Sequence, residues 1–136
     1  MKKSFIVLIL SAFVALNLSC VDKKADSQDV KLVTATEMKS ILDLEDVQLV
    51  DVRTPEEFEE KRISNAQNID FRSPTFDEDI IKLDKSKPVL LYCKSGGRSA
   101  KCVEKLKKAG FEKIYELEGG ISKWEHSKIL SIEKKS

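Results

Sequence analysis

The 136-residue chain has only one histidine and three cysteines, and this scarcity narrows its possible chemistry. The cysteines are Cys20, Cys93 and Cys102. No two of them form a Cys-x-x-Cys pair, which disfavours a thiol-redox role. No set of cysteines and histidines has the spacing of metal ligands either. We therefore expect no metal and no other cofactor. His126, near the C-terminus, is predicted to be a surface residue without a catalytic part.

The sequence also lacks an excess of either charge, because 24 lysines and arginines oppose 23 aspartates and glutamates. Nucleic-acid-binding domains need positive charge to neutralise phosphates, so nucleic acid is not expected as a partner. Internal repeats and low-complexity segments are absent too. Without its N-terminal targeting segment, the chain has the length of one domain with a sizeable core.

The N-terminus has the pattern of a bacterial lipoprotein signal peptide. A basic start precedes an almost wholly apolar run, residues 5–18, which is shorter than the roughly 20 residues that span a bilayer. We expect residues 1–19 to be removed and Cys20 to be lipidated as the first mature residue. Asn17 departs from this pattern, because the usual lipobox has leucine there.

This interpretation predicts a protein in the bacterial cell envelope, held to a membrane by the lipid on Cys20 and facing the periplasm. Val21 is not the acidic residue that some bacteria use for inner-membrane retention, which favours the outer membrane. Residues 20–30 are polar and aperiodic, so they are expected to form a flexible tether. Two alternatives stay open: an ordinary signal peptide with no role for Cys20, and an uncleaved anchor.

Residues 31–130 show strand patterns alternating with helix patterns, and 131–136 are expected to be a polar tail. Strands are predicted over residues 31–33, 47–52, 66–69, 89–92 and 113–116. Helices are predicted after the capping residues Thr34 and Thr54 and over residues 76–83, 99–109 and 121–128. This alternation is typical of an α/β domain, in which a parallel sheet is covered by helices on both faces.

The strongest chemical signal follows the strand at 89–92. Cys93 comes at the end of that apolar run, Gly96 and Gly97 follow, and Ser99 is expected to cap a helix. Backbone N–H groups of such a loop point inward, and the helix dipole adds positive potential. A cysteine held there ionises more easily than a free thiol, so the pattern predicts a nucleophilic sulfur.

Four segments in this order resemble the motifs of the rhodanese-like sulfurtransferases. The active loop of that family is six residues long and begins with the catalytic cysteine, as in Cys93–Arg98. The other three segments are residues 51–58 (Asp-Val-Arg, then Glu-Phe), 63–69 and 117–124 (Leu-x-Gly-Gly, then Trp). The chain departs from the family where Lys61-Arg62 replaces Gly-His and Asn65 replaces glycine, so the pocket rim is expected to differ in shape.

The resemblance implies a rhodanese-like fold with a central parallel five-stranded sheet and helices on both faces. It also implies an enzyme of the thiosulfate sulfurtransferase type. The Cys93 thiolate would take the outer sulfur of thiosulfate or a similar donor and pass it, from a persulfide, to cyanide or a thiol. The expected partners are a small anionic donor and a thiophilic acceptor, with a monomer as the default and a protein partner allowed.

Within the loop, the two cations Lys94 and Arg98 are expected to hold the sulfonate end of thiosulfate or to lower the pKa of Cys93. Each of them has a simpler alternative as a solvated surface charge. Ser95 is expected to donate its hydroxyl to the persulfide. The backbone of Gly96 and Gly97 is expected to turn its N–H groups towards the sulfur.

Three further residues are expected to support the loop or its mouth. The resemblance places Asp51 and Arg53 under the loop, where a structural hydrogen-bonded pair is favoured over an acid–base role. Arg72, just after the third predicted strand, either reaches the pocket mouth or is simply exposed. Cys102 lies on the apolar face of its helix, so it is expected to be a core thiol too distant from Cys93 for a disulfide.

Two other functions remain as alternatives. Phosphatases and arsenate reductases of related folds use a cysteine–arginine loop, but typically with five intervening residues, and only four separate Cys93 from Arg98. The shorter loop suits a single sulfur atom better than a tetrahedral oxyanion. The second alternative is a sulfur-carrier or protein-binding module with little turnover of its own.

Overall fold

The structure, a computed structural model, describes residues 28–136. The predicted signal peptide, Cys20 and most of the predicted tether lie outside the described residues. The first strand, β1, begins at Asp29, two residues before the predicted start of the domain. None of the helices within residues 28–136 has the length and apolar character that crossing a bilayer requires.

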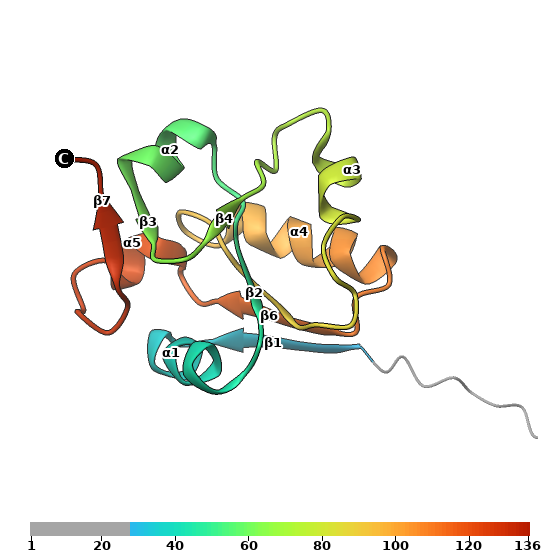
Figure 1. The fold of residues 1–136 in the computed structure, drawn as a ribbon, viewed down its shortest axis with the longest axis horizontal. Helices are drawn as coiled ribbons and strands as arrows, with labels where there is room; N and C mark the ends of the chain where they lie inside the picture. Colours follow the sequence, from blue (N-terminus) through green and yellow to red (C-terminus); the bar gives the residue numbers. More distant parts are fainter. Residues whose placement is uncertain (1–27) are drawn as a thin grey trace, which may run out of the picture.

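A five-stranded sheet forms the centre of the domain (Figure 1). Its strands, in spatial order, are β1 (Asp29–Val33), β6 (Lys113–Leu117), β5 (Val89–Tyr92), β2 (Gln48–Asp51) and β4 (Gln67–Asn68). Every neighbouring pair is parallel, as the alternation of strands and helices predicted. All four residues of β5 are buried, because this central strand is covered on both faces.

Helices cover both faces of this sheet, which confirms the predicted architecture. One face carries α3 (Phe76–Ile80) and α4 (Gly97–Lys108), and the other carries α1 (Ala35–Leu44) and α5 (Gly120–Trp124). Alternate residues of β5 divide between the two layers. Leu91 packs in the core under α4, whereas Leu90 and Tyr92 pack in the core under α1 and α5.

Two helices begin at threonine caps, as predicted. Thr34 precedes α1, and Thr54 precedes α2 (Pro55–Glu60). In each case the threonine side chain accepts a hydrogen bond from the backbone N–H of a glutamate three residues later, Glu37 or Glu57. The glutamate carboxylate accepts the threonine N–H in return. These capping boxes satisfy backbone donors that the first helical turn leaves unpaired.

A second, two-stranded sheet was not predicted. Its strands β3 (Lys61–Ile63) and β7 (Ile132–Lys134) pair antiparallel and lie side by side at one end of the molecule (Figure 1). Residues 131–136 are therefore more than the polar tail expected from the sequence, and the Lys135 N–H also bonds the Glu60 carbonyl at 3.0 Å. The short strand β7 has no local signal, because its partner lies far away in the sequence: Glu133 pairs with Arg62, 71 positions earlier.

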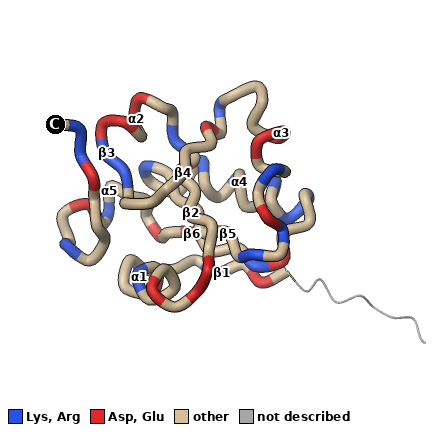
Figure 2. The backbone as a smooth tube through the Cα atoms, in the orientation of Figure 1, with Lys and Arg blue, Asp and Glu red and all other residues tan. Residues whose placement is uncertain are grey.

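Several predicted boundaries differ from the structure. The third predicted strand shortens to β4, α3 ends at Ile80 and α5 ends at Trp124. Helix α4 begins at Gly97 with Gly96 as its N-cap, so the expectation that Ser99 caps this helix is wrong. Charges of both signs are interspersed over the described chain, with acidic positions on α2 beside basic ones on β3 (Figure 2). This agrees with the balanced composition.

Candidate active site

Cys93 lies between the end of β5 and the start of α4, at the carboxyl edge of the parallel sheet. Open α/β sheets place their ligands at this edge. The loop turns at Gly96, whose φ of +107° is a conformation that residues with a Cβ rarely adopt. This turn brings the Gly96 N–H to within 3.0 Å of the Cys93 Sγ.

The Cys93 thiol is held by hydrogen bonds in a buried position, with the residue only 1% exposed. Burial by itself raises the pKa of Cys93. Hydrogen bonds from the Ser99 hydroxyl and from the backbone N–H groups of Ser99, Gly96 and Ser95 outweigh that effect, so the pKa of Cys93 lies below that of an ordinary thiol. The structure thus places a thiol of lowered pKa at the position where the sequence predicts a nucleophile.

Ser99 lies behind the sulfur and contacts three acceptors. Its Oγ lies 3.5 Å from the Cys93 Sγ, 3.1 Å from the Gly96 carbonyl and 2.5 Å from Oε1 of Glu116. The sequence analysis did not include Glu116 in the site. The one available signal was a polar residue at an inward position of β6, between the buried residues Tyr115 and Leu117.

The back of the active loop rests on the start of α5. The backbone N–H groups of Ile121 and Ser122 bond the carbonyls of Cys93 and Lys94 at 2.9 and 3.1 Å. Gly120 has φ of +63°, and a Cβ there would come within 2.4 Å of the Lys94 carbonyl oxygen. The second glycine of the Gly-Gly motif is therefore required for the loop and α5 to approach so closely.

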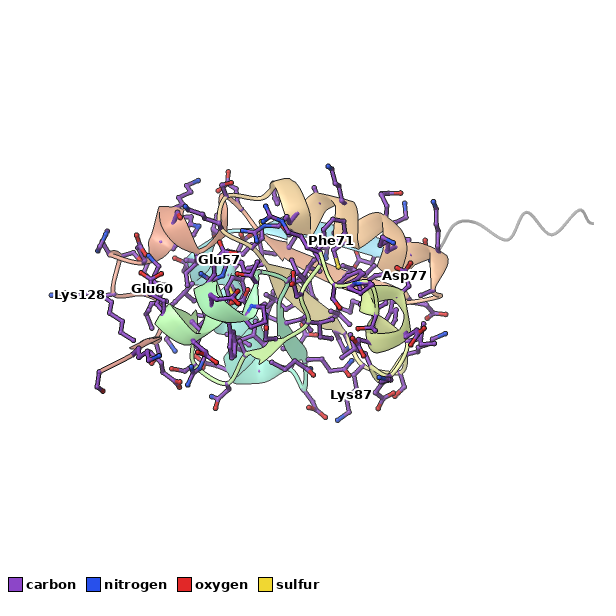
Figure 3. All side chains as sticks on the ribbon, turned by 90° about the horizontal axis from the view of Figure 1, so that it is seen from above. Glu57, Glu60, Phe71, Asp77, Lys87 and Lys128 are labelled. Carbon is purple, nitrogen blue, oxygen red and sulfur yellow. The ribbon has the colours of Figure 1, made fainter. Side chains whose placement is uncertain are left out.

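The two loop cations have different surroundings. Lys94, like Ser95, is exposed at the loop surface. Arg98 instead points towards α2, where its two terminal nitrogens donate to the Glu57 carboxylate at 2.6 and 2.8 Å. Figure 3 shows Glu57 nearer the middle of the molecule than Glu60, which belongs to the same helix. Hydrogen bonds from Arg98 lower the pKa of Glu57 to about 2, so the Arg98 charge is already paired.

Asp51 and Arg53 form the buried pair that the resemblance implied. Nε and Nη2 of Arg53 donate to the Asp51 carboxylate at distances down to 2.6 Å, and both residues are at most 2% exposed. Arg53 also donates to the Lys61 carbonyl at 2.6 Å, and its guanidinium lies 5.7 Å from the ring centre of Tyr92. Because Tyr92 directly precedes Cys93, this network supports the strand that leads into the active loop.

The remaining predicted residues lie apart from the sulfur. Arg72 is exposed, and no hydrogen bond or ion pair joins its side chain to the active loop within the described chain. Cys102 is buried in the core under α4, and both it and Cys93 are free thiols. Burial raises the pKa of Cys102 to about 12, so this thiol is inert at neutral pH. His126 is a surface residue, as predicted.

Residues 28–136 contain no cluster of three or more histidine, cysteine, aspartate or glutamate side chains that could hold a metal ion. The site is instead built from one acidic thiol, its backbone donors and the hydroxyl behind it. A buried thiol stabilised in this way can attack an electrophilic sulfur and carry it covalently.

Fold and site together define an α/β protein that carries a loop with a buried cysteine of lowered pKa at the end of its central strand. The family model described as Rhodanese-like domain matches residues 34–127, and the chain belongs to this family. A solved structure of a rhodanese-like domain protein from Staphylococcus aureus superposes with a TM-score of 0.65 and 34% identity. The match covers 78% of this chain and 99% of that one.

Two relatives show what the similarity covers in sequence. YqhL of Bacillus subtilis (strain 168) is 43% identical over 77 residues, which span 57% of this chain and 60% of that protein. The thiosulfate sulfurtransferase GlpE of Coxiella burnetii is 33% identical over 94 residues, which span 69% of this chain and 86% of GlpE. The family assignment and a relationship to named sulfurtransferases are therefore established.

Proposed function

We propose that this protein is a sulfurtransferase that carries a sulfane sulfur on Cys93. The observation that carries the proposal is the cradle of the Cys93 Sγ, with the Gly96 N–H at 3.0 Å and the Ser99 hydroxyl at 3.5 Å. These donors stabilise a negative sulfur, whether it is the thiolate or the terminal sulfur of a persulfide. The relationship to a thiosulfate sulfurtransferase supports thiosulfate as the donor.

The reaction has two displacement steps. The Cys93 thiolate attacks the outer sulfur of thiosulfate, the bond between the two donor sulfurs breaks, and sulfite leaves with the electron pair. Cyanide or a thiolate then attacks the terminal sulfur of the persulfide, and the Cys93 thiolate is regenerated. Neither step requires an oxidant or a cofactor, because each step transfers one neutral sulfur atom from one nucleophile to another.

Lys94 is the cation best placed to attract the anionic donor. It is exposed on the active loop, whereas the Arg98 guanidinium is paired with Glu57. We therefore assign Arg98 to holding the loop and helix α4 in place, and Lys94 to drawing the sulfonate end of thiosulfate towards the site. A point charge on a flexible stem suits such long-range attraction.

The test is thiosulfate:cyanide sulfur transfer by the purified protein, compared with Cys93→Ser and with Cys102→Ser as the matched control. Mass spectrometry of thiosulfate-treated protein would look for one added sulfur on the Cys93 peptide. Turnover and persulfide should both disappear in Cys93→Ser and persist in Cys102→Ser. A persulfide without turnover would favour the sulfur-carrier alternative, and the absence of both signals would refute the mechanism.

We also propose that Cys20 is lipidated and tethers the domain to the bacterial cell envelope, facing the periplasm. Support comes from the sequence alone: the basic start, the short apolar run and the Ser19-Cys20 junction. The test is the mass of the mature N-terminal peptide from cells, compared with Cys20→Ser. A mature chain that begins at an unmodified residue, or that keeps residues 1–19, would contradict this proposal.

A further inference from the structure

The Ser99 hydroxyl contacts three groups that can accept its single proton. Its Oγ is 3.5 Å from the Cys93 Sγ on one side and 2.5 Å from Oε1 of Glu116 on the other. The third contact, the Gly96 carbonyl at 3.1 Å, can only accept. A hydroxyl donates one hydrogen bond, so the protonation of Glu116 decides whether that bond is free to reach the sulfur.

Glu116 is placed to change its protonation. It is half-buried on β6, and burial raises the pKa of its carboxyl while the Ser99 hydrogen bond lowers it less. Its second oxygen, Oε2, has no hydrogen-bond partner among the described residues. Since no polar side-chain atom in that part of the chain is both buried and unpaired, Oε2 reaches solvent. Protons therefore have a route to the carboxyl from outside.

The elements packed against Glu116 bring few other charges to it. The neighbouring residues in register are Leu91 on β5 and Leu32 on β1, which are both apolar. Helix α4 contributes Ser99 and the high-pKa thiol of Cys102. Glu118 directly follows β6, and its carboxylate is paired with Lys123 at 2.7 Å. Within residues 28–136, Glu116 has no ion-pair partner.

We propose that Glu116 is a positioning residue that controls the proton state of Cys93 through the Ser99 hydroxyl. When Glu116 is ionised, it accepts the Ser99 proton at 2.5 Å, and the hydroxyl cannot donate to the sulfur. When Glu116 is protonated, it donates to the Ser99 Oγ, and the Ser99 proton turns to the Cys93 thiolate, whose charge makes it a stronger acceptor than the neutral Gly96 carbonyl. Protons enter and leave this hydrogen-bonded path at Oε2 of Glu116.

The two ionisations are consequently linked with a defined sign. Protonation of Glu116 makes Cys93 a stronger acid, and by reciprocity the Cys93 thiolate makes Glu116 a weaker one. As pH falls, Glu116 takes up a proton and the thiolate gains a hydrogen bond. The thiolate population therefore declines more gradually with falling pH than that of a single isolated thiol.

This inference rests on the proposed function only in taking the thiolate as the reacting species. It is tested by the rate of Cys93 alkylation with iodoacetamide between pH 4 and 9, read by peptide mass spectrometry, so it does not depend on sulfur transfer. Wild-type protein should show two ionisations in this profile. A profile with a single ionisation would overturn the proposal, even if no variant could be studied.

Substitutions of Ser99 and Glu116, alone and combined, form a double-mutant cycle. Ser99→Ala should slow alkylation about tenfold at pH 6, because losing one charge-assisted hydrogen bond is worth about one pKa unit. Glu116→Gln, a neutral mimic of the protonated acid, should speed it several-fold and leave one ionisation. In the Ser99→Ala background, Glu116→Gln should change the rate by less than about twofold, because the linking hydroxyl is gone.

Glu118→Gln is the matched control, since it removes a carboxylate two residues away that is already paired with Lys123. Its profile should keep both ionisations. Equal effects of Glu116→Gln with and without Ser99 would show a through-space charge effect and overturn the hydrogen-bonded path. An unchanged profile in Glu116→Gln would do the same. If this pattern holds while thiosulfate turnover is absent, the proposed function fails and the proton linkage stands.

Discussion

Arg98 and Glu57 are joined by two hydrogen bonds, at 2.6 and 2.8 Å, across 41 positions of sequence. Arg98 is the last residue of the active loop and lies in the first turn of α4, whereas Glu57 lies in the first turn of α2. The pair therefore fastens the loop to an element that precedes it by two strands of the sheet. A fork-to-fork geometry of this kind fixes orientation as well as distance.

Glu57→Gln is expected to weaken the fold in a pH-dependent way. The pKa of Glu57 is lowered to about 2 by the Arg98 hydrogen bonds, so its stabilising effect is complete above its ordinary pKa of about 4.3 and is lost as pH falls towards 2. Because the pair is partly exposed, the loss at pH 7 should be about 1–2 kcal/mol. Urea unfolding at pH 7 and pH 3 measures it.

Glu56→Gln is the control, because Glu56 is exposed in the same helical turn. Glutamine at position 57 keeps an acceptor for the Thr54 N–H, so the capping box does not confound the comparison. The gap between wild type and Glu57→Gln should narrow as pH falls. A gap that stays constant from pH 7 to pH 3 would contradict the assigned role of the charge.

Asp51→Asn is expected to be far more damaging. The substitution leaves the Arg53 guanidinium buried without its counter-charge, since both residues are at most 2% exposed. Breaking a buried pair from one side costs about 3–5 kcal/mol. Thermal and urea unfolding should show this loss, whereas Asp46→Asn, which removes the exposed partner of Lys87, should cost little. Similar losses in the two variants would refute the structural role of the buried pair.

Gly120→Ala separates a steric clash from backbone strain. Its new Cβ would come within 2.4 Å of the Lys94 carbonyl oxygen, in a residue with φ of +63°. Gly110→Ala is the matched control, because Gly110 also has positive φ but nothing lies within 4 Å of a Cβ there. Both variants carry a strain of about 1–2 kcal/mol.

Only Gly120→Ala should lower the free energy of unfolding by more than this strain energy, because the loop must also move away from α5. For the same reason, only this variant should slow the alkylation of Cys93. Urea unfolding and iodoacetamide kinetics provide the two measurements. Equal stability losses with unchanged Cys93 kinetics in both variants would show that the close approach of α5 does not shape the active loop.

Truncation after Leu130 is expected to lower stability while leaving the sulfur site intact. It removes β7 and its pairing with β3, together with the ion pair of Arg62 and Glu133 at 2.9 Å. With about 1 kcal/mol net for each hydrogen bond, the loss should be about 1–3 kcal/mol. Deletion of Ser136 alone is the control. If the truncated chain were as stable as the full-length protein, residues 131–136 would contribute no more to stability than an unstructured polar tail.

Some features of this protein follow from local sequence. The apolar run before Cys93 can only be a buried central strand, and the two threonines with a glutamate three residues later mark helix starts wherever they occur. The glycine loop after Cys93 likewise needs a left-handed turn, which presents backbone N–H groups to the sulfur. These are short-range effects of side-chain size, capping and backbone freedom, so the fold class and the position of the cysteine loop could be predicted.

Other features exist only because distant segments meet. Glu116 reaches Ser99 from 17 positions away, Glu57 reaches Arg98 from 41, and β7 pairs with β3 across most of the domain. No local pattern marks Glu116 as a partner of Ser99, and the capping position that singles out Glu57 gives no indication of its pairing with Arg98. Tertiary structure decided these partnerships, because a hydrogen bond depends on distance in space, and parallel strand order sets that distance only after the chain has folded.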